Sequence, residues 1–358
     1  MIIDVHTHVV PPMRAPSAAE RAGGWPYIVS DGSALRVLQR EVLLRSLTPP
    51  AWDTAARISQ MDQYAVDAQA VMPAPFTFLY GCEPSLAADF AAEQNEAIAE
   101  FCAADPSRLV GFASVPLQDP ERAVTELRRA MLSQGLRGVE IGTNAVALQL
   151  HDPELDPFFS AAEDLDVPVF IHPGPLEQAG RAVHSGLSFA LARPVETELA
   201  AGSLVFGGVL ERHPRLKICL AHGGGGVPAM TGRWEVGWAK RTPGVRPDSL
   251  SPRALLRRLW ADTLTYDPFV LPLTERVFGA NHLVVGTDMP FAAQESPPGA
   301  AAAEAARAGI FADPALDLDV LGANARTFLG IEAPDATAFA PEPAHESAHL
   351  AAQIGESQ

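Results

Sequence analysis

The feature that most constrains the fold is an alternation of short apolar strands with helical patterns along about the first 290 residues. The longest expected helices cover residues 87–103 and 196–212. Strands joined by helices pair in parallel, and eight such units predict an α/β protein with a closed (β/α)8 TIM barrel. The expected strands cover residues 1–10, 67–72, 109–115, 135–141, 167–172, 216–221, 260–264 and 282–287.

An open, doubly wound sheet is the structural alternative, because it has the same alternation. Such a sheet places a glycine-rich loop after its first strand. Here the first strand ends in His6-Thr7-His8, and Pro11-Pro12 follow. The barrel is therefore preferred, with residues 1–330 as a single domain.

Two segments fall outside the alternation. Residues 11–50 mix Pro, Gly, Arg and Ser with β-like runs at 35–38 and 42–44, which predicts a small hairpin excursion over the barrel mouth. Residues 331–358 are rich in Ala, Pro, Glu and His and have little periodicity. We expect them to form a flexible tail or to dock a neighbouring subunit.

Charge and composition exclude several classes of partner. The formal net charge is −17, which argues against nucleic acid and anionic membranes because both need a basic surface. No apolar run approaches the roughly 18 to 20 residues needed to cross a bilayer. The three cysteines are few and irregularly spaced, and the chain begins directly with a strand, so we expect a cytoplasmic protein.

The first strand presents two histidines. Side chains in a strand alternate between faces, so His6 and His8 point the same way. A metal ion would satisfy both imidazoles, whereas hydrogen bonds to backbone carbonyls are the alternative. Further ligands downstream decide between these interpretations.

Histidine and aspartate residues, which are able to bind a metal, also occur at the carboxyl ends of other expected strands, where barrel enzymes place their active sites. His172 ends the fifth strand, His222 follows the sixth and Asp288 the eighth. His6, His8, His172 and Asp288 form a nitrogen and carboxylate ligand set that suits Zn²⁺, with Mn²⁺ or Fe²⁺ less suited. His222 is either a fifth ligand or an acid–base residue, and the glycines after it favour the second role.

The motifs around these residues resemble those of a known superfamily. They are His-x-His at strand one, His-Pro at strand five, Ala-His-Gly-Gly-Gly at strand six and Gly-Thr-Asp-x-Pro-Phe at strand eight. Together they resemble the amidohydrolase superfamily, within it the branch of aminocarboxymuconate semialdehyde decarboxylase and related aromatic-acid decarboxylases. The likeness extends over about residues 1–330. No lysine ends strand four, where binuclear members carry a carboxylated lysine, so the resemblance implies a single metal.

The resemblance also implies roles for individual residues. It makes His6, His8, His172 and Asp288 the ligands of one zinc ion, and His222 the acid–base residue.

It further implies residues that bind substrate. Arg233 becomes a carboxylate-binding arginine delivered across a homodimer interface. A second arginine comes from the excursion, where the local pattern around residues 31–37 selects Arg36 but spacing back from Trp52-Asp53 selects Arg45. Phe189 falls where the decarboxylase carries a tryptophan near its substrate.

Three functions follow from this reasoning. The preferred one is a metal-dependent, non-oxidative decarboxylase of a small unsaturated or aromatic carboxylic acid, because the motifs resemble the decarboxylase branch and arginines suit anionic substrates. The second is a hydrolase or hydratase of a related carboxylated lactone, amide or enol acid, since fold and metal site do not fix the reaction. The third is a metal-binding protein without catalysis, which the full ligand set disfavours.

Overall fold

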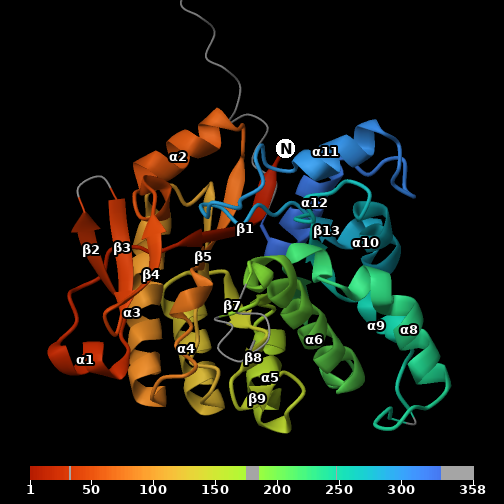
Figure 1. Cartoon of the computed structure of the whole chain (residues 1–358), viewed down its shortest axis with the longest axis horizontal. Coiled ribbons are helices and arrows are strands. Elements are labelled where there is room, and N and C mark those ends of the chain that lie inside the picture. Colours follow the sequence, from red (N-terminus) through yellow and green to blue (C-terminus); the bar gives the residue numbers. More distant parts are fainter. Residues whose placement is uncertain (32–33, 175–184, 247, 332–358) are drawn as a thin grey trace, which may run out of the picture.

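A computed structural model describes residues 1–31, 34–174, 185–246 and 248–331. Eight parallel strands form one sheet in chain order (Figure 1). Bridges from Asp4 to Val285 and from Thr7 to Met289 join the last strand region to the first. The predicted TIM barrel is confirmed. Its strands are β1 (Ile3–Val9), β5 (Ala68–Pro73), β6 (Leu109–Ala113), β7 (Gly138–Gly142), β10 (Pro168–His172), β11 (Lys217–Leu220), β12 (Trp260–Asp262) and β13 (Leu283–Val284).

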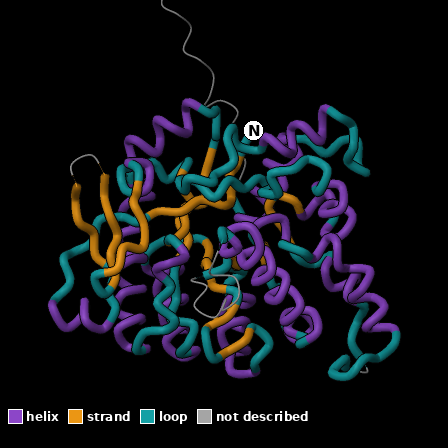
Figure 2. The backbone as a smooth tube through the Cα atoms, in the orientation of Figure 1, coloured by secondary structure: helices purple, strands orange, loops and turns teal. Residues whose placement is uncertain are grey.

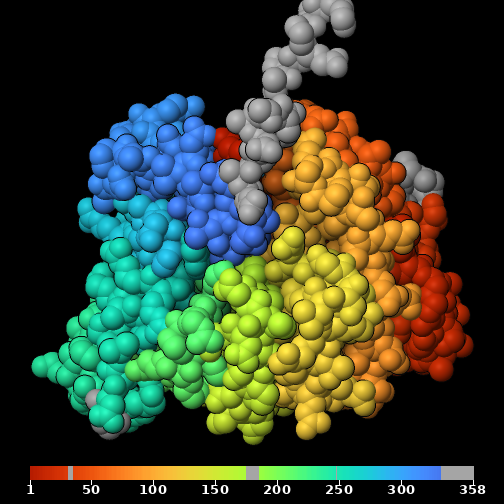
Figure 3. All heavy atoms as spheres, turned by 180° about the vertical axis from the view of Figure 1, so that it is seen from behind, coloured from red at the N-terminus to blue at the C-terminus, as the bar shows by residue number. Residues whose placement is uncertain are grey.

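Helices surround these strands (Figure 2). From behind, successive segments lie side by side around the surface in chain order, as βα units require (Figure 3). No helix in the described part of the chain is long and apolar enough to cross a bilayer. The larger helices are α2 (Thr54–Gln63), α3 (Pro84–Ala103), α4 (Pro120–Ser133), α5 (Asp156–Asp164), α6 (Arg193–Phe206), α8 (Val227–Ala239), α10 (Leu271–Phe278), α11 (Ala300–Arg307) and α12 (Leu318–Leu329).

Two apolar clusters make up most of the core. The larger one fills the space between strands and helices. The other draws residues such as Val5, Phe112 and Phe170 from every strand except β7 and therefore lies inside the barrel, with Phe328 of α12 among its members. At β7 the buried Glu140 interrupts the apolar strand.

The helix expected over residues 196–212 is wrong as a single helix. It is divided into α6 (Arg193–Phe206) and α7 (Val209–Arg212) at Gly207-Gly208. Gly208 has φ +77°, in the left-handed region that glycine adopts readily but a continuous helix excludes.

The excursion contains three strands rather than a two-stranded hairpin. Helix α1 (Ala18–Gly23) precedes an antiparallel sheet of β2 (Tyr27–Asp31), β3 (Ala34–Gln39) and β4 (Val42–Leu47). Val37 and Leu47 pack with Val10 and Ala74, which directly follow β1 and β5. This sheet therefore lies at the carboxyl ends of the barrel strands. Apart from Ile331, the expected tail lies outside the described residues.

Candidate metal centre and active site

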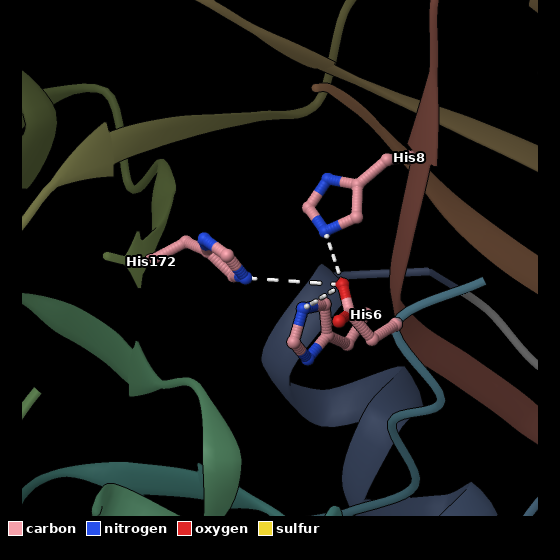
Figure 4. A group of neighbouring side chains, drawn as sticks. His6, His8 and His172 are labelled. Atoms are coloured by element: carbon pink, nitrogen blue, oxygen red, sulfur yellow. Dashed lines mark ion pairs between the residues drawn. The ribbon is translucent and has the colours of Figure 1, made fainter. Parts of the chain in front are cut away.

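The predicted ligand residues come together at the carboxyl end of the barrel. Figure 4 shows the three labelled histidine rings directed at one carboxylate oxygen. That atom, Asp288 Oδ1, lies 3.1 Å from His8 Nε2, 3.4 Å from His6 Nε2 and 3.9 Å from His172 Nε2. All four ligand atoms lie within 4.8 Å of one another, and all four residues are buried.

These four atoms fit a divalent metal. Within the described residues, none of the three Nε2 atoms nor Asp288 Oδ1 has a hydrogen-bond partner, although each is buried. Buried polar atoms without partners are costly, and one cation would satisfy all four. His8 Nδ1 donates to the Pro73 carbonyl at 3.1 Å and His172 Nδ1 to the Pro173 carbonyl at 2.9 Å. These bonds leave each Nε2 available as a ligand.

Asp262 at the end of β12 holds this arrangement in place. Its Oδ2 accepts hydrogen bonds from His6 Nδ1 at 2.6 Å and from the His222 backbone N–H at 3.0 Å. Its Oδ1 accepts from the backbone N–H groups of Gly223 at 2.8 Å and Leu264 at 3.1 Å. Sequence reasoning missed Asp262, although a carboxylate within the expected barrel strand over residues 260–264 was a usable signal.

Charges within the cluster set its protonation. Burial and the neighbouring His8 and His222 hold the pKa of His172 well below its usual range, so this imidazole is neutral, the form that binds metal. Burial opposes the charged form of Asp288, but the neighbouring His6 and His8 side chains keep its pKa well below the usual value. Asp288 is thus a carboxylate at neutral pH.

His222 lies beside the four ligands without joining them. Its ring centroid is 5.3 Å from that of His6 and 5.0 Å from that of His172. It falls outside the group whose ligand atoms lie within 4.8 Å. Burial and the neighbouring His6 lower the pKa of His222 to about 4. A neutral imidazole in this position is able to accept a proton.

A small cavity of about 240 Å³ opens next to the cluster, and His172 and Asp288 are among its lining residues. Two residues expected to bind substrate, Arg45 and Phe189, also line it. The other lining residues are Pro75, Phe76, Gly174, Ser188, Arg193, Phe291, Ala292 and Ala293.

The register of the excursion separates the two arginine candidates. Arg45 pairs with Val37 across β3 and β4, and directly opposed residues share a face of the sheet. Val37 is buried against the barrel, so Arg45 lies on that face, whereas the adjacent Arg36 lies on the opposite one. Arg36 does not line the described cavity.

Arg233 is not brought to the cavity of its own chain. It is an exposed residue of α8. Trp234 packs against Phe206 with ring centroids 5.4 Å apart, and Trp238 Nε1 donates to the Ser249 carbonyl at 3.1 Å. His184, another possible site histidine on the loop after strand five, lies outside the described residues.

Sequence reasoning also missed two charged residues near the site. Arg193 begins α6 and lines the cavity. Glu140 lies inside the barrel, with Oε1 3.7 Å from His8 Nδ1 and neither carboxyl oxygen hydrogen-bonded among the described residues. Burial raises the pKa of Glu140 well above its usual value. In the sequence, Glu140 could have been recognised as a single charged residue between apolar neighbours of a buried strand.

Known proteins resemble this chain along most of its length. The family model described as amidohydrolase matches residues 3–331. A 2-amino-3-carboxymuconate-6-semialdehyde decarboxylase from Dictyostelium discoideum is 34% identical over 339 residues, covering 92% of each chain.

Two solved structures are similar in fold and sequence. A 5-carboxyvanillate decarboxylase from Sphingomonas paucimobilis matches with a TM-score of 0.69 and 26% identity, covering 79% of this chain and 85% of that one. A dihydroxybenzoic acid decarboxylase from a Polaromonas species, with bound manganese and the inhibitor 2-nitroresorcinol, matches with a TM-score of 0.70 and 26% identity, covering 79% and 88%.

Proposed function

The chain belongs to the amidohydrolase family, and on this basis we propose that it is a metal-dependent, non-oxidative decarboxylase of a small aromatic or unsaturated carboxylic acid. One observation carries the proposal: a buried three-histidine, one-aspartate cluster opens into a cavity that combines aromatic walls with arginine. The aromatic side chains suit a flat conjugated acid, and the guanidinium suits its carboxylate.

We propose one Zn²⁺ per chain, held by His6, His8, His172 and Asp288. A nitrogen-rich set without thiolates supports zinc, and Mn²⁺ is the next candidate because the Polaromonas relative contains manganese. When bound, the cation supplies positive charge that polarises a substrate oxygen.

The chain's own residues supply binding and proton transfer in this proposal. Arg45 binds a substrate carboxylate, while Phe189 and Phe291 border the conjugated part of the molecule. The bond between the substrate carbon and its carboxylate breaks and CO₂ leaves. Neutral His222 takes up a proton from solvent water and delivers it to the carbon that lost CO₂, where the proton bonds to the electron pair left by the broken C–C bond.

The decisive assay measures CO₂. Metal-loaded protein is incubated with dicarboxylated muconates and hydroxybenzoates, and CO₂ release is compared with the opening of carboxylated lactones. We expect CO₂ from at least one acid and none from a His222→Asn control. Lactone opening or water addition without CO₂ would replace the proposal by the hydrolase or hydratase alternative, because a neutral histidine beside a metal serves those reactions too.

We also propose that the enzyme acts as a cytoplasmic homodimer in which Arg233 reaches the partner's site. Arg233 is exposed, and the adjoining groove between α6 and α8 presents apolar side chains, with Val195 40% and Leu199 61% exposed. Such surface favours association. The few, irregularly spaced cysteines support a reducing compartment.

A complementation experiment tests the dimer. An inactive His222→Ala chain is mixed with an inactive Arg233→Ala chain under conditions that exchange subunits. If Arg233 acts in the partner's site, mixed dimers contain one site with both residues intact and regain part of the activity. No recovery in mixtures shown to contain mixed dimers would assign Arg233 to its own chain or to no catalytic role.

A further inference from the structure

Two guanidinium groups of one chain line the same small cavity, although the protein is strongly acidic. Arg45 comes from β4 in the excursion and Arg193 from the first residue of α6. In the described part of the chain, neither arginine forms an ion pair with a carboxylate, and Asp288, which also lines the cavity, directs Oδ1 at the histidines. The cavity therefore holds more positive charge than its own side chains neutralise.

Both arginines contact residues that in turn contact the histidines of the metal centre. The Arg45 guanidinium lies 5.3 Å from the Phe291 ring centroid, and that ring stacks on His8 at 5.1 Å. Arg193 Nη1 donates to the Pro173 carbonyl at 3.4 Å, the same oxygen that accepts from His172 Nδ1. The two groups are thus fixed relative to the metal ligands.

The electrostatics support binding of an anion. Burial lowers the pKa of Arg193 and the charge of Arg45 lowers it too, although the Asp288 carboxylate acts in the opposite direction. Like charges held together in a partly buried site repel each other, and an anion placed between them relieves both repulsion and desolvation.

We propose that Arg193 is a specificity-determining residue that binds, together with Arg45, a second acidic group of the substrate. The first acidic group faces the metal cluster, and the second lies between the guanidiniums. The preferred ligand is then a planar diacid. With about 240 Å³ of space, below the roughly 300 to 1,000 Å³ of common ligand cavities, a single ring or short conjugated chain is favoured.

This inference rests on the proposed function only in naming the diacid as substrate. The diacid site is also independent of the proposed dimer, because Arg45 and Arg193 belong to the same chain, whereas Arg233 would come from the partner. A diacid site would thus persist in a monomer.

Binding measurements test the inference separately from catalysis. Benzoate and isophthalate, which differ by one carboxylate, are titrated calorimetrically into the metal-loaded and metal-free protein. The variants are Arg193→Gln, Arg193→Lys and, as a matched control, Arg137→Gln, which changes an exposed arginine before β7. Circular dichroism and thermal unfolding verify that each variant is folded.

We expect the wild type to prefer isophthalate. Arg193→Gln should weaken isophthalate binding by roughly 10- to 100-fold, the loss typical of one hydrogen bond to a charged group, and change benzoate binding less than twofold. Arg193→Lys should restore part of the preference, and Arg137→Gln should change neither affinity.

Equal losses for both acids, or no loss for either, would overturn the role of Arg193. If Arg193→Gln does not fold, the same outcomes are scored with Arg193→Lys, for which a partial loss confined to isophthalate is expected. Selective loss of isophthalate binding in a protein that releases no CO₂ from any acid would support the diacid site and reject the decarboxylase. CO₂ release without a selective loss of isophthalate binding would support the decarboxylase and reject the diacid site.

Discussion

Replacing Asp262 by Asn probes the residue that joins the metal ligands to His222. The Asp262 carboxylate accepts four hydrogen bonds, two on each oxygen. Asparagine keeps one accepting oxygen and replaces the other by an NH₂ group, which only donates. In either orientation of the side chain, this NH₂ group faces two hydrogen-bond donors. Burial opposes the charged form, yet the bond from His6 still lowers the pKa of Asp262, and the carboxylate is therefore the form that the fold requires.

The magnitude follows from those contacts. Two buried donors without partners, at about 1 to 3 kcal/mol each, predict a loss of roughly 2 to 6 kcal/mol in the free energy of unfolding. A ligand histidine that loses its orienting carboxylate typically loses about 10- to 100-fold in metal affinity. We therefore expect both stability and metal affinity to fall, with activity falling at limiting metal.

The assay is competition with a chelator at fixed pH, combined with thermal unfolding of the metal-free protein. Glu275→Gln is the control, because Glu275 is a buried carboxylate outside the cluster that accepts from the backbone N–H groups of Ala312 at 2.6 Å and Asp313 at 2.7 Å. It should lose stability but retain metal affinity. An Asp262→Asn variant that binds metal as tightly as the wild type would refute the orienting role.

Three further outcomes are expected. Elemental analysis should find one divalent metal per chain in the wild type, and His172→Ala should lose both metal and activity. His222→Asn should retain metal but lose roughly 10²- to 10⁴-fold in turnover; a metal-free variant would make His222 a ligand. Burial raises the pKa of Glu295 to about 7, so folding favours its neutral form. The contribution of Glu295 to stability should therefore be greatest below about pH 4.5 and be lost as pH rises through 7. Thermal unfolding should show a smaller fall between pH 5 and 8 for Glu295→Gln.

The sequence predicted the barrel and the residues of the metal cluster because both depend on strand position. In a parallel barrel all carboxyl ends meet at one rim. The barrel therefore brings together His172, at the end of one strand, and Asp288, just after another. The conformation of the intervening loops does not affect this. Spacing by two within β1 similarly places His6 and His8 on one face.

Residues whose role depends on a distant partner escaped prediction. The expected strand over residues 260–264 placed Asp262 in its middle, whereas β12 ends at Asp262, and the partner His6 lies 256 positions away. Arg193 precedes the expected helix start at residue 196, so its entry into the cavity was not indicated. The choice between Arg36 and Arg45 depended on strand register, which a bulge between Val37 and Leu38 shifts.

The backbone at the site explains why these distant contacts matter. His222 and Asp288 have φ of +57° and +61°, in the left-handed region that costs a non-glycine residue roughly 1 to 2 kcal/mol. Each is held there by a hydrogen bond from its own backbone N–H, to Asp262 for His222 and to the His6 carbonyl for Asp288 at 2.9 Å. A strained backbone conformation persists only where several surrounding contacts hold it in place. Asp262 also accepts a hydrogen bond from His6. One carboxylate therefore sets both the orientation of His6 and the strained turn that places His222 beside it, so a change at Asp262 should disturb the candidate metal centre and the proposed proton-transfer residue together.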